Sequence, residues 1–277
     1  MITRIITAIV MLIAVLPIII FSHTVILPVA ISIIAFVSVI EMMKCTGCSH
    51  NLWFSIPAAL ISAVLPIGGW FIKDKKQFIL LALVVFYLFF LFILSATVLK
   101  RGKQKIVDSC FNFAAVVYVM VGFTSVVLIR CLDMGAYLYL MVFVASCMTD
   151  IFAYFTGRLF GRHKLIVEVS PKKTVEGAIG GVVFCSLSFV IYGLCIGRIF
   201  DTTPNYIVLA LAGIILSVIS QFGDLIASLV KRQFGIKDFG KILPGHGGFL
   251  DRFDSSIAIA PVMLIFCSFP EFFTLFG

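Results

Sequence analysis

Charge is what this sequence has least of. Of its 277 residues, 12% are charged and 62% are hydrophobic, and the mean hydropathy is +1.19. A soluble domain carries about twice that share of charged residues. The scarcity of charge therefore excludes an ordinary water-soluble domain.

Four further absences narrow the class of protein. The chain has no internal repeat and no terminal tail long enough for a separate soluble domain, which argues against an ABC-type ATPase. It also lacks a G-x-x-x-x-G-K-[ST] motif, so an ordinary P-loop motor is not indicated. The eight cysteines imply no disulfide framework. Cys45 and Cys48 form a C-x-x-C beside His50, but with no second such motif in reach a metal site there is not favoured.

What the sequence does contain is long apolar blocks. About 20 apolar residues cross a bilayer as a helix, and these blocks are too long for barrel strands. The first block lacks the short core and cleavage site of a signal peptide, so we expect it to be retained. The sequence predicts an all-α, polytopic integral membrane protein with about nine transmembrane helices, at residues 5–22, 24–42, 53–72, 78–98, 108–129, 136–156, 177–197, 205–229 and 254–274.

The positions of Lys and Arg predict the orientation. One side holds five cations: Lys73, Lys75, Lys76, Arg130 and Arg198. The other side holds sixteen: Arg4, Lys44, Lys100, Arg101, Lys103, Lys105, Arg158, Arg162, Lys164, Lys172, Lys173, Lys231, Arg232, Lys237, Lys241 and Arg252. We expect the richer side to face the cytoplasm from the inner (cytoplasmic) membrane. The net charge of +8 then reflects topology and anionic lipid, and no nucleic-acid partner is predicted.

Ionisable residues inside spans mark function by default, and here they gather in the C-terminal half. Residues 1–140 carry no motif, whereas 141–277 is predicted to be a catalytic region within one integrated membrane domain. Its first polar segment has Asp150, Tyr154 and Arg158 on one helix face. Gly157 and Gly161 allow another helix to approach closely, which makes a homodimer possible. The alternative for this segment is a plain packing face.

The second polar segment is SPKKTVEGAIGG, from Ser170 to Gly181. Pro171 breaks any helix, and Ser170 or Thr174 can cap the next span. Lys172 and Lys173 then stand before a helix N-terminus, where anions are favoured, so a phosphate site is reasonable. The alternative is a positively charged cytoplasmic flank with an N-cap.

The third polar segment runs from Gln221 to Ser256. Gln221, Asp224, Ser228 and Arg232 lie near one helical face, with Lys231 at its edge. Asp251 and Asp254 follow at the start of the last span, where Asp254, Ser255 and Ser256 are alternatively N-cap candidates.

Carboxylates, cations and glycines occur together in this third segment. Hard oxygen ligands in small number suit Mg²⁺. The interleaved cations suit a polyphosphate, and Gly245, Gly247 and Gly248 allow backbone amides to approach phosphate oxygens. The combination indicates metal-bridged phosphate chemistry at a membrane surface.

The segment SLVKRQFGIKDFGKILPGHGGFLDRFD, from Ser228 to Asp254, resembles the signature of the phosphatidate cytidylyltransferases, also called CDP-diacylglycerol synthases. The resemblance extends upstream through QFGDLIAS and SPKKTVEG to DIFAYFTGRLFG and covers roughly residues 145–257. It implies an integral membrane nucleotidyltransferase of phospholipid biosynthesis, which makes CDP-diacylglycerol and pyrophosphate from CTP and phosphatidate with Mg²⁺.

The resemblance also implies roles for single residues. Asp224 and Asp251 are expected at the metal centre, with K⁺ as a candidate second cation. Asp254 and Asp150 are candidate further ligands of the metal, or support the ligands. Arg252 is a candidate to orient Asp251 or grip the lipid phosphate. The expected nucleotide or phosphate contacts are Lys172, Lys173, Ser228, Lys231, Arg232, His246, Gly247 and Gly248.

Two alternatives stay open at this point. A polyprenol-type kinase would use CTP as a phosphoryl donor and need a base for a neutral hydroxyl, and the complete Ser228–Asp254 pattern argues against it. A lipid transporter or flippase predicts ionisable residues scattered through several spans, or paired between repeat halves. Here they cluster at one predicted membrane face.

Overall fold

The computed structural model describes residues 2–99, 105–269, 275 and 276. Within these residues the chain is almost entirely helical, and it divides into two compact units. The first unit is Met1–Leu128 with Phe234–Arg252, and the second is Ile129–Gln233 with Phe253–Gly277.

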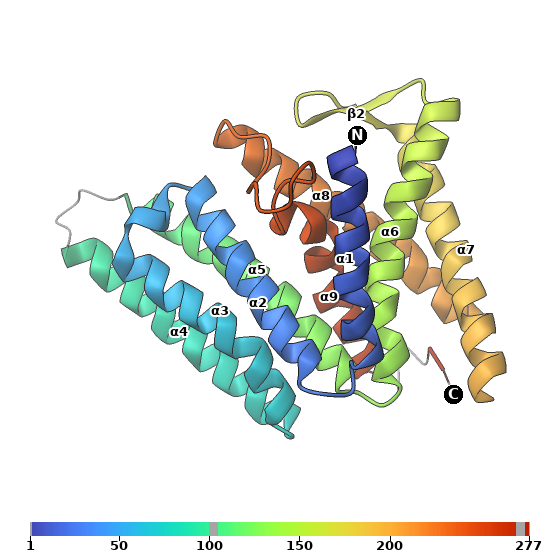
Figure 1. Ribbon diagram of the computed structural model, residues 1–277, viewed down its shortest axis with the longest axis horizontal. Coiled ribbons are helices and arrows are strands. Elements are labelled where there is room, and N and C mark those ends of the chain that lie inside the picture. Colours follow the sequence, from blue (N-terminus) through green and yellow to red (C-terminus); the bar gives the residue numbers. More distant parts are fainter. Residues whose placement is uncertain (1, 100–104, 270–274, 277) are drawn as a thin grey trace. The chain divides into compact units, whose positions relative to one another are not determined.

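The first unit is built from consecutive antiparallel helices. They are α1 (Ile2–Ile20), α2 (Ile26–Cys45), α3 (Leu52–Phe71), α4 (Lys75–Leu99) and most of α5 (Ile106–Arg130), with a short 3₁₀ helix, η1 (Cys48–His50), between α2 and α3. α3 packs against both α2 and α4, and the helices lie side by side in Figure 1. The Phe89 ring joins α4 to its neighbours, since it contacts Phe54 of α3 and Phe113 of α5. Residues 234–249 complete this unit as a loop that leads into α9 (Leu250–Ser268).

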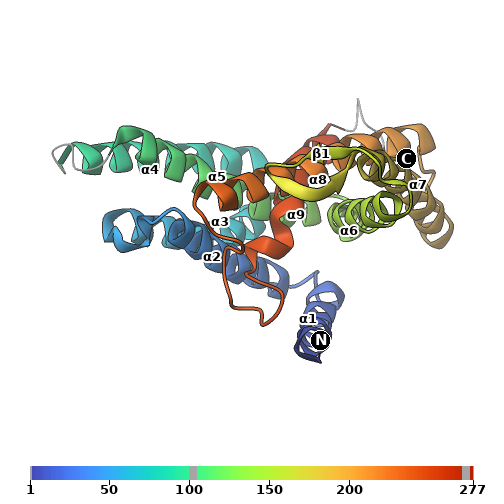
Figure 2. The same cartoon turned by 90° about the horizontal axis from the view of Figure 1, so that it is seen from above.

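The second unit consists of long helices and a hairpin. α6 (Gly135–Phe160), α7 (Val175–Phe200) and α8 (Tyr206–Gln233) pack against one another, and the part of α9 from Phe253 onward joins them. The antiparallel strands β1 (Lys164–Ile166) and β2 (Ser170–Thr174) connect α6 to α7. Figures 1 and 2 show this hairpin lying across the end of the unit where α6 stops and α7 starts.

The predicted fold class is confirmed, because among the described residues seven helices are long and apolar enough to cross a membrane. They are α2 to α8, and each lies within a few residues of its predicted span. α1 contributes an apolar stretch from Ile9 to Ile20, and α9 has three charged residues near its start. The crossing of the membrane by α1 and α9 therefore stays a prediction.

Some predictions fall outside what the structure describes. Lys100, Arg101 and Lys103 of the predicted cytoplasmic loop lie outside the described residues, as do 270–274 of the last predicted span, and the side chain of Arg4 is likewise not described. The functional division at residue 140 stays a prediction too.

Close contact between α6 and α7 depends on glycine. A Cβ on Gly177 would lie 2.7 Å from the carbonyl oxygen of Ala153 and 3.2 Å from the Cα of Gly157. Gly181, one turn later, lies similarly close to the Thr149 carbonyl oxygen, at 3.0 Å. The expected close approach at Gly157 is thus between α6 and α7 of one chain, so it does not require a second copy.

We expect Gly177→Ala to destabilise this contact, because its methyl group would meet backbone atoms that cannot rotate away. Overpacking of this kind costs about 1–3 kcal/mol, which corresponds to several degrees in the thermal midpoint. The measurement is thermal unfolding of the purified protein in detergent. Gly68→Ala in α3 is the control, since its Cβ would lie 3.4 Å from the Phe78 ring, an ordinary contact. An equal midpoint for both variants would contradict the assignment.

Candidate active site

A pocket of about 270 Å³, lined by both charged and apolar residues, lies in the second unit, where α6, α7 and the hairpin meet. Its lining includes residues from both of the first two predicted polar segments: Asp150, Tyr154, Gly157, Arg158, Lys172, Lys173, Thr174 and Gly177. We call it the Lys172/Lys173 pocket. The structure therefore brings together Asp150, Tyr154 and Arg158, as their spacing on one helix face predicted. Arg158 also donates a hydrogen bond to the Tyr154 hydroxyl over 3.3 Å.

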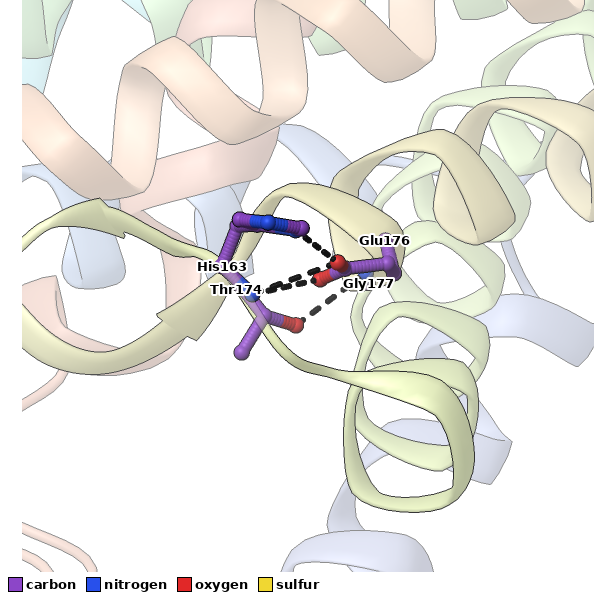
Figure 3. Close-up of polar contacts among 4 residues, drawn as sticks. All are labelled: His163, Thr174, Glu176 and Gly177. Carbon is purple, nitrogen blue, oxygen red and sulfur yellow. Dashed lines mark hydrogen bonds and ion pairs between the residues drawn. The ribbon is translucent and has the colours of Figure 1, made fainter.

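Hydrogen bonds hold together the base of the hairpin that carries the two lysines. The Thr174 hydroxyl accepts a hydrogen bond from the Gly177 N–H and so caps α7, which confirms one of the two predicted caps. The Glu176 carboxylate contacts the His163 ring at 2.7 Å and also accepts the His163 backbone N–H (Figure 3). In addition, the Val175 N–H donates to the His163 carbonyl oxygen. These contacts hold both ends of the hairpin together and so fix the strand that presents Lys172 and Lys173.

The Lys173 ammonium forms an ion pair with the Asp224 carboxylate of α8. Both side chains are about one quarter exposed, at 27% and 28%. The Lys173 nitrogen itself is buried, and it makes no further hydrogen bond among the described residues. An ammonium has three donors, so the pair with Asp224 leaves donor capacity beside the pocket.

Three aspartates of this unit, Asp150, Asp224 and Asp254, lie near one another. The Asp254 carboxylate is within electrostatic reach of Asp224, Asp150 and Lys231, and it accepts the Ser255 backbone N–H at 2.8 Å. Among the described residues, however, no three Asp, Glu, His or Cys side chains are close enough to form a ready-made metal site. Oxygen donors of this kind suit Mg²⁺ when water and phosphate complete its shell. The residues thus fit the ion by their chemistry, and the predicted roles as ligands stay predictions.

The glycine-rich loop, residues 234–249, forms an open hollow of about 630 Å³ in the first unit. Its lining is strongly polar and includes the cations Lys237, Lys241 and Arg252 together with His246. Gly245 and Gly247 have φ values of 78° and 87°, a conformation that other residues rarely adopt. The Nδ1 atom of His246 is buried and has no hydrogen-bond partner among the described residues. That nitrogen is therefore a candidate to hydrogen-bond a ligand, and the role of His246 stays a prediction.

Asp251 holds this loop in shape from the first turn of α9. Its Oδ2 atom accepts the backbone N–H groups of Phe239 at 2.8 Å and Gly248 at 3.0 Å. The residue is only 8% exposed. The aspartate expected at the metal centre therefore also joins the middle of the loop to its C-terminal end.

Glu41 of α2 is a site residue that the sequence analysis missed. It is 2% exposed, and its two carboxylate oxygens accept the N–H groups of Phe249 at 3.2 Å and Leu250 at 2.9 Å. A Cβ at Gly240 or Gly248 would come within 2.1 or 2.5 Å of Glu41 oxygen, so both glycines make room for this carboxylate. Its signal in the sequence was a lone carboxylate inside an otherwise apolar span, the kind of residue that marks function.

The observed start of α9 contradicts the alternative that Asp254, Ser255 or Ser256 caps the last helix. The helix begins at Leu250, so Asp254, Ser255 and Ser256 lie inside it and do not cap it. The capping alternative is wrong because Glu41, from another helix, satisfies the first free N–H groups in their place.

The remaining predicted residues lie on or next to α8. Ser228 and Lys231 are half-buried, and Arg232 is exposed at its C-terminal end. Gln221 donates to the Ala178 carbonyl oxygen of α7 at 3.1 Å and lines the Lys172/Lys173 pocket. Among the described residues no disulfide joins any of the eight cysteines, Cys45 and Cys48 included.

Comparison with known proteins gives one consistent result. The phosphatidate cytidylyltransferase of Staphylococcus haemolyticus (strain JCSC1435) is 38% identical over 267 residues, covering 95% of this chain and 97% of that protein. The phosphatidate cytidylyltransferase of Staphylococcus aureus (strain COL) is 38% identical over 271 residues with the same coverage, and that of Staphylococcus saprophyticus is 37% identical over 270. A cytidylyltransferase family model matches residues 2–270. The chain therefore belongs to the cytidylyltransferase family.

Proposed function

We propose that this protein transfers the CMP moiety of CTP to phosphatidate and gives CDP-diacylglycerol and pyrophosphate. The observation that carries the proposal is end-to-end similarity, at up to 38% identity, to proteins named phosphatidate cytidylyltransferase. The Lys172/Lys173 pocket and the basic hollow of the glycine-rich loop support it, since both substrates are polyanions.

The reaction makes one phosphoanhydride bond and breaks another. An oxygen of the phosphatidate phosphate attacks the α-phosphorus of CTP, and the bond from that phosphorus to the bridging oxygen breaks, so that pyrophosphate leaves with the electron pair. A phosphate monoester is already largely ionised at pH 7, so no strong general base is required. This agrees with a site made of cations and carboxylates.

Electrostatic repulsion between two anions is then the main obstacle to the reaction. Fixed positive charge lowers that barrier because it stabilises charge as it develops on the leaving group. Lys172, Lys173 and Arg158 offer such charge in the Lys172/Lys173 pocket, whereas Lys237, Lys241 and Arg252 offer it around the glycine-rich loop. Lys231 and Arg232 add charge at the end of α8. Backbone amides of the loop and the His246 nitrogen are further donors for phosphate oxygens.

We assign Mg²⁺ to the aspartates. Asp224 and Asp251 are the proposed ligands, with Asp254 and Asp150 as further candidates and K⁺ as a candidate second cation. When bound, the ion would neutralise part of the phosphate charge. Asp251 has a second task, because the same side chain holds Phe239 and Gly248.

We place the site at the cytoplasmic face of the inner membrane. The excess of Lys and Arg in the segments that carry the site supports this orientation. CTP is available on that side, and the lipid phosphate lies in the headgroup plane of the same leaflet.

The proposal predicts where the label of radioactive CTP goes. With phosphatidate and Mg²⁺, the purified protein should move the α-phosphorus of CTP into lipid and release the γ-phosphorus as pyrophosphate. Chelation of Mg²⁺ should stop the reaction, and adding Mg²⁺ back should restore it. Thin-layer chromatography of the lipid and water phases measures the labelled lipid and the labelled pyrophosphate. Transfer of the γ-phosphorus into lipid would instead identify a kinase, and no phosphatidate-dependent product would overturn the proposal.

We expect Asp251→Asn to lower turnover at least ~100-fold while the protein stays folded. Asparagine keeps an oxygen that accepts the N–H groups of Phe239 and Gly248, but it removes the charge proposed to hold the metal. Loss of one strong electrostatic contact costs a factor of about 10² to 10³. Steady-state rates and the thermal midpoint are measured together, with Asp201→Asn as control, an exposed residue with φ 53° that asparagine tolerates. Near-normal turnover of Asp251→Asn would remove the metal-ligand assignment.

We expect Glu41→Gln to loosen the glycine-rich loop, because a side-chain amide has one acceptor oxygen for the two N–H groups of Phe249 and Leu250. An unsatisfied buried N–H costs about 1–3 kcal/mol. Trypsin should then cut faster after the exposed Lys237 and Lys241, and kcat should fall more than the KM for CTP rises.

Ser38→Ala is the matched control for Glu41→Gln. Ser38 lies one turn earlier on α2, is fully buried, and its hydroxyl has no partner among the described residues. Its loss should leave both the cleavage rate and kcat near wild type. Equal cleavage rates for Glu41→Gln and Ser38→Ala would show that Glu41 does not hold the loop.

A further inference from the structure

An apolar groove of about 380 Å³ runs between α7 and α8, beside the Lys172/Lys173 pocket. Its walls are almost purely aliphatic and aromatic, and they include Ile179, Val182 and Val183 of α7 with Val218, Phe222 and Leu225 of α8. β1 borders one end of the groove through Leu165 and Ile166. All of these residues belong to the second unit.

The groove and the Lys172/Lys173 pocket adjoin each other. Leu165, Ala178 and Gln221 line both of them. The Gln221 side chain is fixed at this boundary by its hydrogen bond to the Ala178 carbonyl oxygen. Taken together, the two adjoining hollows offer an amphipathic cavity, with the pocket as its cationic end and the groove as its apolar end.

The cationic end is suited to a phosphate. The pocket is lined by Arg158, Lys172 and Lys173 against a single acidic residue, Asp150. Lys173 is additionally paired with Asp224 at the pocket's edge. The charge of the lining residues is therefore positive, which complements an anionic head group.

The apolar end faces outward from the helices. Ile179 is 60% exposed, Val183 56% and Phe222 60%, although both helices are long and apolar enough to lie in a membrane. A ligand in this groove is consequently accessible from the lipid and has no need to enter from water. CTP has no apolar part that would match the groove, whereas a lipid with a terminal phosphate matches both ends.

We propose that this cavity binds phosphatidate, with the phosphate at Lys172 and Lys173 and one acyl chain along the α7–α8 groove. The assignment rests on the proposed function, and it names which of the two substrates the second unit takes. It also predicts that the groove, and not the lysines, senses the length of the acyl chain.

The kinetic test uses a substitution that fills the groove and leaves both lysines unchanged. Val183→Trp should raise the KM for long-chain phosphatidate about 10-fold, since losing a fitted apolar contact costs 10-fold or more. The KM for CTP, and kcat with a short-chain phosphatidate, should stay within about 2-fold of wild type. Ile191→Trp is the control, a residue of the same helix that is 50% exposed and is not part of the groove lining. An equal KM for long-chain phosphatidate in the two variants would overturn the assignment. A raised KM for CTP in Val183→Trp alone would also overturn it.

A binding test separates this inference from the proposed function. Phosphatidate with a photoreactive acyl chain should label peptides of α7 and α8 around Val183 and Phe222 in the wild-type protein. Glycerol 3-phosphate, which has the head without chains, should compete weakly, and photoreactive diacylglycerol, which lacks the phosphate, should label weakly. Labelling elsewhere in an active enzyme overturns the inference and leaves the function intact. Labelling of the groove in a protein without transferase activity supports the lipid site and removes the function.

Discussion

Each buried or half-buried carboxylate of the site has to find donors, and this requirement shapes the structure around it. An unpaired carboxylate among apolar helices costs several kcal/mol. Glu41 meets the requirement with the N–H groups of Phe249 and Leu250, and Asp251 with those of Phe239 and Gly248. Asp224 meets it with the Lys173 ammonium. In the glycine-rich loop, the contacts that satisfy Glu41 and Asp251 are the same contacts that hold the loop in its conformation.

The carboxylates of the two units are paired with different kinds of donor. In the first unit the donors are backbone amides, so a segment without regular secondary structure is held between α2 and the start of α9. In the second unit the donor is a side chain, and the hairpin that carries it is closed by Glu176, His163 and Thr174. Backbone amides stay where the fold puts them, whereas a lysine side chain can share its donors with a ligand. The loop is therefore suited to a fixed cradle, and Lys173 to a contact that changes when a ligand binds.

The sequence predicted the helices well because a membrane span has a strong one-dimensional signal. Seven spans from α2 to α8 were found from apolar length alone, and the face shared by Asp150, Tyr154 and Arg158 follows from the helical repeat. The hairpin was missed because three and five residues of exposed strand have little hydrophobic pattern. Glu41 was missed for a different reason. Its partners lie more than 200 positions away in the chain, and no local pattern reports a contact across that separation.

Within the proposed function, the Lys173–Asp224 pair explains how the pocket can hold a buried lysine before substrate binds, without an excess of buried positive charge. With no substrate present, Asp224 neutralises the lysine, and the pocket avoids an uncompensated cation near apolar helices. A lipid phosphate brings negative charge of its own, so it can take over donors of Lys173, which lines the pocket. Asp224 is then less occupied by the lysine and has oxygens available for a cation. Under the proposed function, a single ion pair thereby links the binding of the lipid phosphate to the charge state around Asp224, the carboxylate proposed to hold the metal.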